Sequence, residues 1–150
     1  MELEILINND IKNAMLARDP EKLEALRAIK AALLLEKTKE GTTGEIPESV
    51  ELKLLQKLVK QRRESADIYA AAGREDLAGK ERFEASIIEK YLPQQMGEAE
   101  VTEKIRQIIA QTQASSIKDM GKVMGAASKE LAGKADNKMV SEIVKKLLGA

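Results

Sequence analysis

Cysteine, histidine and tryptophan are absent from this chain of 150 residues, which contains only two tyrosines and one phenylalanine. The lack of cysteine and histidine excludes disulfides, thiol nucleophiles, the usual zinc sites and any serine–histidine or cysteine–histidine catalytic pair. Only carboxylates, lysines, tyrosines and hydroxyls remain for chemistry, so we expect no catalytic residue, no cofactor and no metal. The shortage of aromatic side chains also disfavours binding of single-stranded nucleic acid by base stacking.

A net charge of either sign is lacking too, because 25 lysines and arginines balance 25 aspartates and glutamates. The balance is not uniform, since residues 113–150 contain seven lysines against four acidic residues. Long apolar runs are missing, and Glu2 and Glu4 interrupt the apolar start, so neither a secretory signal nor a membrane span is expected. We therefore expect a cytoplasmic protein without a membrane partner.

What the chain does contain is a helical pattern throughout. Alternation of β-branched and aromatic residues is absent, and alanine, leucine, glutamate, lysine and glutamine dominate, which predicts an all-α fold. Asp19 and Pro20 form a helix start signal, and Gly73 is a natural left-handed helix end. The expected helices cover about 2–18, 20–39, 47–72, 74–91, 98–112, 117–131 and 136–148.

Two domains are expected from these helices, with a loop at Gly41–Gly44 inside the first. The long helices on either side of Gly73 form a helical hairpin, and Pro93 interrupts the pattern after them because proline lacks the amide donor. We predict an N-terminal four-helix domain at 1–92 and a C-terminal three-helix domain at 93–150.

Charged residues stand in the apolar stripes of the predicted hairpin. Arg62 lies within the stripe of its helix, while Glu81 and Glu84 share an apolar face of the next helix. If Gly73 is the turn of the hairpin, Arg62 faces Glu84. Because a half-buried arginine requires a carboxylate partner, we expect a structural ion pair with Glu81 as the substitute acid. Binding of a ligand by Arg62 is the alternative.

Two glycines within one short helix are unusual, because a glycine in a helix interior costs about 1 kcal/mol relative to alanine. Close approach of a neighbouring helix or of a bound backbone would offset this cost at Gly121 and Gly125. Lys118, Lys122 and Lys129 fall within about 40° of one another on an ideal helix, opposite its apolar stripe.

These lysines form a candidate nucleic-acid-binding surface, since flexible cations on a rigid face contact phosphates. Lys134 and Lys138 lie around the start of the last helix and add to it, because helix N-terminal amides attract anions. An ordinary solvated helix face shows the same pattern, so the residues leave both interpretations open.

Several motifs carry a resemblance to a known family. They are Arg62-x-Glu64-Ser65-x-x-x-Tyr69-x-x-Ala72-Gly73-Arg74, Tyr91-Leu92-Pro93, Lys118-Asp119-Met120-Gly121-Lys122 and Gly133-Lys134-Ala135-Asp136. Together they resemble the GatB/YqeY family, and in particular its stand-alone YqeY-like members. The resemblance implies that the C-terminal domain is similar to the tail of the GatB subunit of tRNA amidotransferase, a tRNA-binding attachment. The catalytic portions of that enzyme have no counterpart in this chain.

The resemblance and the lysines together suggest a non-catalytic accessory protein that binds tRNA or a tRNA-charging or amidotransferase enzyme. An adaptor that binds proteins without RNA is the alternative, through the hairpin or through a groove formed by Met120, Met124 and Met139. A role in glutamine-dependent carbon–nitrogen ligation is the third possibility, and it rests on the family resemblance alone.

Overall fold

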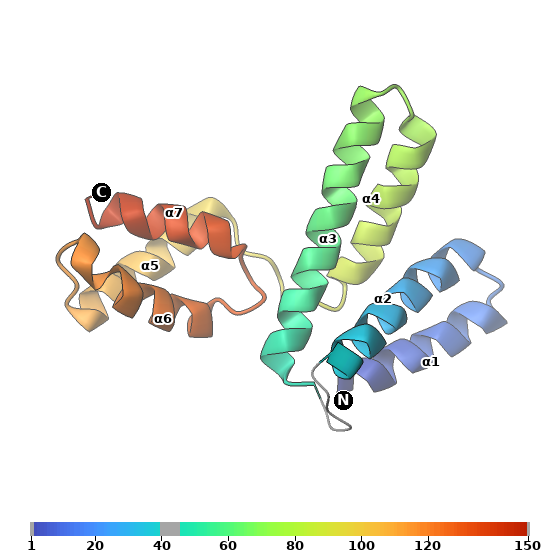
Figure 1. The fold of residues 1–150 in the computed structure, drawn as a ribbon, viewed down its shortest axis with the longest axis horizontal. Helices are drawn as coiled ribbons and strands as arrows, with labels where there is room; N and C mark the ends of the chain where they lie inside the picture. The colour runs from blue at the N-terminus through green and yellow to red at the C-terminus, as the bar shows by residue number, and fades with distance from the viewer. Residues whose placement is uncertain (1, 40–45, 150) are drawn as a thin grey trace. The chain divides into compact units, whose positions relative to one another are not determined.

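The computed structural model describes residues 2–39 and 46–149, which contain seven α-helices, one 3-10 helix and no strand (Figure 1). The expected all-α fold class is confirmed. The loop predicted at Gly41–Gly44 lies outside the described residues. The chain divides into two compact units, Met1–Leu92 and Pro93–Ala150.

The first unit consists of two helical hairpins. Its helices are α1 (Glu2–Leu16), α2 (Pro20–Lys39), α3 (Glu48–Ala71) and α4 (Glu75–Glu89). Helices α3 and α4 lie side by side along their length, and α2 contacts α1, α3 and α4 (Figure 1). The buried core of the unit comprises Ile7, Ala14, Ala25, Leu26, Ile29, Leu33, Leu55, Val59, Ala85, Ile87 and Ile88.

Both hairpin turns follow from local sequence. Asp19 caps α2, since its Oδ1 accepts a hydrogen bond from the Lys22 amide at 3.2 Å, and Pro20 begins the helix. Gly73 adopts a φ of 76°, and the Arg74 amide donates to the Tyr69 carbonyl at 2.8 Å. This six-residue closure is the Schellman end of a helix, and it reverses the chain between α3 and α4.

The second unit contains α5 (Glu98–Thr112), a 3-10 helix at Ile117–Asp119, α6 (Met120–Glu130) and α7 (Asn137–Leu147), with each α-helix in contact with the other two. Its core comprises Val101, Ile105, Ile108, Val123, Ala127, Leu131, Ala135, Val140, Ile143, Val144 and Leu148. Met120, Met124 and Met139 are partly buried against this core. They lie at the edge of the core with part of each side chain exposed, and the groove expected from them stays a prediction.

The structure differs from the single helix expected over 117–131. Ser116 Oγ accepts a hydrogen bond from the Lys118 amide at 3.3 Å, and Asp119 Oδ2 accepts from the amides of Ser115 and Ser116 at 2.9 and 3.3 Å. This capping box makes a 3-10 turn of Ile117–Asp119 before α6 begins. Lys118 therefore precedes α6, and its side chain does not point in the direction that an unbroken α-helix over 117–131 would give it.

The segment that enters the second unit is held by hydrogen bonds within the unit. The Met96 amide donates to the Lys134 carbonyl at 2.9 Å, and Gln95 Nε2 donates to the Gly133 carbonyl at 2.6 Å. Gly133 has a φ of 73°, a conformation that favours glycine. Among residues 2–39 and 46–149, no helix is both long enough and apolar enough to cross a membrane.

Replacing Ile88 by alanine should lower the free energy of unfolding of the first unit by about 2–5 kcal/mol, because its side chain is fully buried. Ile68, on the partner helix of the same hairpin, is 69 % exposed and is the matched control, with an expected effect within about 0.5 kcal/mol. Both tyrosines lie in this unit, so tyrosine fluorescence during urea unfolding measures it. Equal losses for the two variants would contradict the described core.

Candidate functional site

Lysines project from the side of α6 that faces away from its core stripe. Val123 and Ala127 are fully buried, whereas Lys122, Gly125 and Lys129 are exposed. At 100° per residue these three exposed positions fall within about 60° of one another. Lys118, in the 3-10 turn, is also exposed. We call Lys118, Lys122, Gly125 and Lys129 the lysine face.

The two glycines of α6 are not explained by a neighbouring helix. A Cβ atom added to Gly121 or Gly125 would have no described atom within 4 Å, and neither glycine has a positive φ. The expected close approach of a neighbouring helix is therefore wrong, because both glycines lie on the exposed side of α6. Close approach of a bound molecule stays a prediction.

Lys122 has a structural contact that sequence reasoning missed. Its Nζ donates a hydrogen bond to the Thr112 carbonyl at 3.0 Å, and Thr112 is the last residue of α5. Terminal carbonyls of a helix have no partner within the helix, so a lysine there satisfies one of them. Lys122 thus joins α6 to α5, and its replacement affects packing as well as charge.

The start of α7 offers less to an anion than the sequence suggests. Asp136 Oδ1 accepts a hydrogen bond from the Lys138 amide at 3.4 Å, so the helix already carries a carboxylate cap. The side chains of Lys134 and Lys138 are exposed. Lys145 lies seven residues after Lys138 on the same exposed face of α7, a repeat that a helical count detects but that the sequence interpretation did not use.

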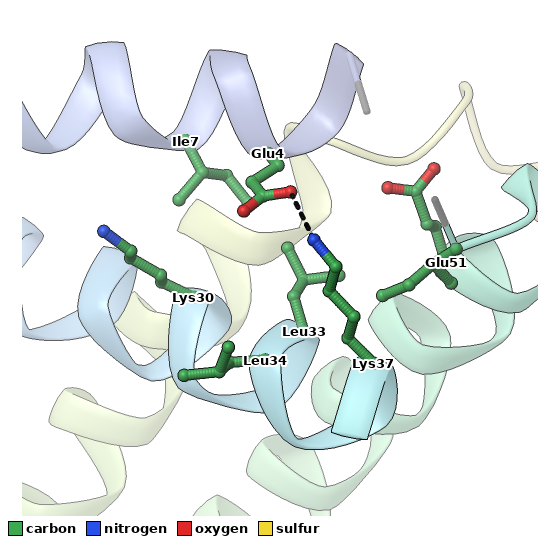
Figure 2. Close-up of a pocket in the computed structure, with 8 residues that line it drawn as sticks. Glu4, Ile7, Lys30, Leu33, Leu34, Lys37 and Glu51 are labelled. Carbon is green, nitrogen blue, oxygen red and sulfur yellow. Dashed lines mark ion pairs between the residues drawn. The ribbon is translucent and has the colours of Figure 1, made fainter. Parts of the chain in front are cut away.

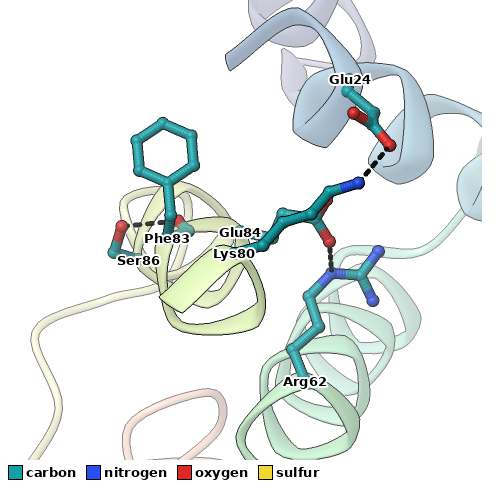
Figure 3. A network of polar contacts seen from close by, with 6 residues as sticks. All are labelled: Glu24, Arg62, Lys80, Phe83, Glu84 and Ser86. Carbon is teal, nitrogen blue, oxygen red and sulfur yellow. Dashed lines mark hydrogen bonds and ion pairs between the residues drawn. The ribbon is translucent and has the colours of Figure 1, made fainter. Parts of the chain in front are cut away.

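Arg62 and Glu84 meet in the interior of the α3–α4 hairpin (Figure 3). Arg62 Nε lies 3.1 Å from Glu84 Oε2, and the two side chains are 18 % and 11 % exposed. Although the distance is that of an ion pair, Nε has no partner with hydrogen-bond alignment. The contact is thus a charge interaction, and Glu81, half-buried one turn away, has no ion pair with a described residue.

Burial raises the pKa of Glu84, the nearby Arg62 guanidinium opposes this shift, and the Glu81 carboxylate reinforces it. A raised pKa means that folded Glu84 holds its proton more tightly than the unfolded chain does. The resulting contribution to stability is present at low pH and is lost as the pH rises from the ordinary value of 4.5 through the folded-state pKa. The attraction between Arg62 and ionised Glu84 therefore offsets only part of the cost of removing the Glu84 carboxylate from water.

Two further polar contacts join helices of the first unit. Lys80 Nζ on α4 lies 3.1 Å from Glu24 Oε1 on α2, next to the Arg62–Glu84 pair (Figure 3). The Tyr91 hydroxyl, after α4, donates to Asp10 Oδ2 on α1, and burial followed by this bond raises the pKa of Tyr91. Neither pairing was anticipated from the sequence, because the helices involved are far apart along the chain.

A small cavity between α1, α2 and α3 has a volume of about 60 Å³. Its lining is apolar at Ile7 and Leu33, and Lys37 Nζ lies 4.0 Å from Glu4 Oε2 at its edge (Figure 2). Sites for cofactors and drug-sized ligands usually measure about 300–1,000 Å³, so this cavity is too small for one. The described parts of the chain also contain no group of three or more acidic side chains placed to hold a metal ion.

Comparison with known proteins identifies the family. The profile described as Yqey-like protein matches residues 5–148. The protein "Altered inheritance of mitochondria protein 41, mitochondrial" of Meyerozyma guilliermondii is 33 % identical over 145 residues, which cover 95 % of this chain and 74 % of the relative. Its namesake in Pyrenophora tritici-repentis is 29 % identical over 145 residues, 94 % of this chain and 78 % of the relative. The chain belongs to the YqeY-like family.

These relatives contradict the cytoplasmic location expected from the sequence, because their names describe them as mitochondrial proteins. The expectation rested on the lack of an apolar signal segment. Such a segment directs secretion, and its absence does not distinguish the cytoplasm from an organelle.

Replacing Glu84 by alanine should lower the free energy of unfolding by about 1–3 kcal/mol, because Arg62, half-buried at 18 % exposure, then loses its counter-charge. The double variant Arg62→Leu/Glu84→Leu removes both charges and should cost less than Glu84→Ala. Urea unfolding followed by tyrosine fluorescence measures both. A loss below about 1 kcal/mol for Glu84→Ala is the behaviour of a solvated surface pair and would reject the buried one.

Replacing Gly125 by alanine should raise the free energy of unfolding of the second unit by about 1 kcal/mol, since the added methyl group meets no atom. Gly133→Ala is the control in the same unit and should lower it, because alanine is strained at a φ of 73°. Thermal unfolding followed by circular dichroism compares the two. A destabilised Gly125→Ala variant would show that α6 has a neighbour at this position.

Proposed function

We propose that this YqeY-like protein is a non-catalytic accessory protein that binds structured RNA, in the first instance tRNA, through the lysine face of its second unit. The observation that carries the proposal is the alignment of exposed lysines opposite the buried stripe of α6. Lysines on a rigid helix contact successive phosphates without reading bases, and they release counterions as they do so.

The composition of the second unit supports recognition by shape. Tyr69, Phe83 and Tyr91 all belong to the first unit, so residues 93–150 have no aromatic side chain on which a base stacks. Single-stranded nucleic acid is bound mainly by such stacking, whereas double-stranded RNA is recognised by its phosphates and 2′-hydroxyls. A folded RNA is therefore the better ligand for this surface.

Gly125 lies among these lysines and leaves the helix backbone bare. A side chain at this position would keep a phosphodiester chain farther from α6, while Lys122 and Lys129 lie on either side to contact its phosphates. Glycine here makes α6 less stable than alanine would, and it allows a ligand to approach the helix backbone closely. This trade supports a ligand on the lysine face.

The partner class follows from the resemblance to the tail of the GatB subunit of tRNA amidotransferase. An attachment of that kind brings tRNA to an enzyme whose chemistry lies elsewhere, so any role in glutamine-dependent amidation requires a second protein. Because the relatives are named as mitochondrial proteins, organellar tRNA is included among the ligands to be tested.

A protein-binding adaptor is the second candidate function. Large apolar side chains are exposed on the first hairpin: Leu16 is 74 %, Leu34 is 64 % and Leu35 is 71 % exposed. Leu34 and Leu35 are adjacent on α2, and contiguous exposed apolar surface is typical of sites that bind another protein. This surface lies in the first unit, so variants of the lysine face separate the two functions.

The full chain should bind a total tRNA preparation at low salt, with an affinity that falls with salt at a log–log slope of roughly two to three, as expected for about three phosphate contacts. Lys118→Glu/Lys129→Glu should abolish this binding. Lys122 is left intact because of its bond to Thr112. Fluorescence anisotropy with labelled tRNA measures the affinity.

The variant Lys53→Glu/Lys60→Glu changes two exposed lysines of α3 and alters the net charge equally, so it is the matched control. It should retain most of the affinity of the unaltered chain. Equal losses in the two variants, or no binding of tRNA at low salt, would reject RNA binding by the lysine face and favour the adaptor.

A further inference from the structure

A second polar site lies in the first unit, separate from the lysine face. Helices α3 and α4 line an open, solvent-facing pocket of about 480 Å³ on one side of the hairpin. Its lining consists of Gln61, Arg62, Glu64, Ser65 and Ile68 from α3, with Glu81 and Glu84 from α4. The volume falls within the range of about 300–1,000 Å³ that small-molecule sites occupy.

The arginine in this cavity is bound to the protein by one edge only. Glu84 contacts Arg62 through Nε, and no described residue accepts a hydrogen bond from the two terminal nitrogens. Figure 3 shows these nitrogens directed away from Glu84. Nε is the only Arg62 atom that is both buried and unpartnered, so the terminal nitrogens remain accessible. A guanidinium presented in this way forms a fork that matches the two oxygens of a carboxylate.

The carboxylates in the cavity restrict which ligand fits the fork. Glu64 and Glu81 form no ion pair with a described residue, and with Glu84 they place three acids around Arg62. Among the described residues, the other cation near Glu81 and Glu84 is Lys80, which is paired with Glu24. A simple anion would be repelled by these acids, and a simple cation would be repelled by Arg62. A ligand with a carboxylate and an ammonium group a few ångströms apart satisfies both sets of charges.

The remaining lining residues suit the rest of such a molecule. Ser65 and Gln61 supply hydroxyl and amide groups for hydrogen bonds, and Ile68 is 69 % exposed at the edge of the cavity, where it can pack against an apolar side chain. We propose that the cavity between α3 and α4 is a binding site for a free α-amino acid. Its carboxylate binds Arg62, its ammonium group binds Glu81, and its side chain contacts Ile68.

The position of Glu84 agrees with this assignment. A binding arginine must be held in one orientation before the ligand arrives, or the ligand must supply the cost of ordering it. Glu84 is 8 % exposed, and its charge attracts Arg62 from the protein side without an aligned hydrogen bond to Nε. The ion pair is then the support of the site, and the opposite edge of the arginine is its binding surface.

The proposal is tested by titrating the full chain, labelled with ¹⁵N, with L-leucine while amide resonances are recorded by NMR. We expect saturable shifts centred on Ser65, Ile68 and Glu81, with a dissociation constant on the order of 1 mM. N-acetyl-L-leucine lacks the ammonium group and L-leucinamide lacks the carboxylate, so each should bind at least about tenfold more weakly. Binding of all three compounds with equal affinity would overturn the proposal.

Variants locate the site independently of the ligand series. Glu81→Gln removes an acid that has no ion pair and should weaken L-leucine binding by about tenfold. Asp67→Asn changes an exposed acid of α3 that does not line the cavity, and should leave binding unaltered. Arg62→Lys keeps a cation for Glu84 but removes the fork, so a folded Arg62→Lys chain should lose the preference for L-leucine over L-leucinamide. No saturation by L-leucine, or equal binding in Glu81→Gln and the unaltered chain, would overturn the assignment.

Discussion

The half-buried charge of Arg62 constrains how α3 packs against α4. A half-buried guanidinium requires a carboxylate within contact distance, and Glu84 meets this requirement in the observed register of α3 against α4. The turn at Gly73 supplies that register, because its left-handed backbone reverses the chain at the required point. The apolar side chains of the hairpin then fall opposite one another, and α2 packs on the surface that the pair of helices presents.

The two units divide the chemistry of the chain between them. The first contains all the aromatic residues, the buried ion pair and the polar cavity, whereas the second contains the exposed lysines. A surface of lysines on a short rigid helix suits an extended polyanion, which makes several weak contacts. A pocket with one arginine suits a small molecule, which makes few contacts in a fixed geometry. The two proposed ligands differ so much in size that one surface would not substitute for the other.

Much of this arrangement could be predicted from the sequence, and what could not has physical causes. Helical periodicity and the signals at Asp19 and Gly73 are local, so the all-α class and the approximate helix ends follow from them. The 3-10 turn that begins at Ser116 was not predicted, because a capping box does not change the helical spacing of the apolar residues around it. The contacts of Lys122 with Thr112 and of Tyr91 with Asp10 depend on how helices pack, which a single sequence does not specify. The exposed glycines of α6 were misjudged for the same reason.

The hydrogen bonds made by Gln95 and Met96 bear on whether the second unit could be fused to another protein. They close the entry of the second unit onto its own turn at Gly133 and Lys134, so the start of the unit is anchored by its own residues. A gene fusion that joins another coding segment ahead of residue 93 would leave this clasp intact. The first residues of the second unit are therefore held by hydrogen bonds within that unit.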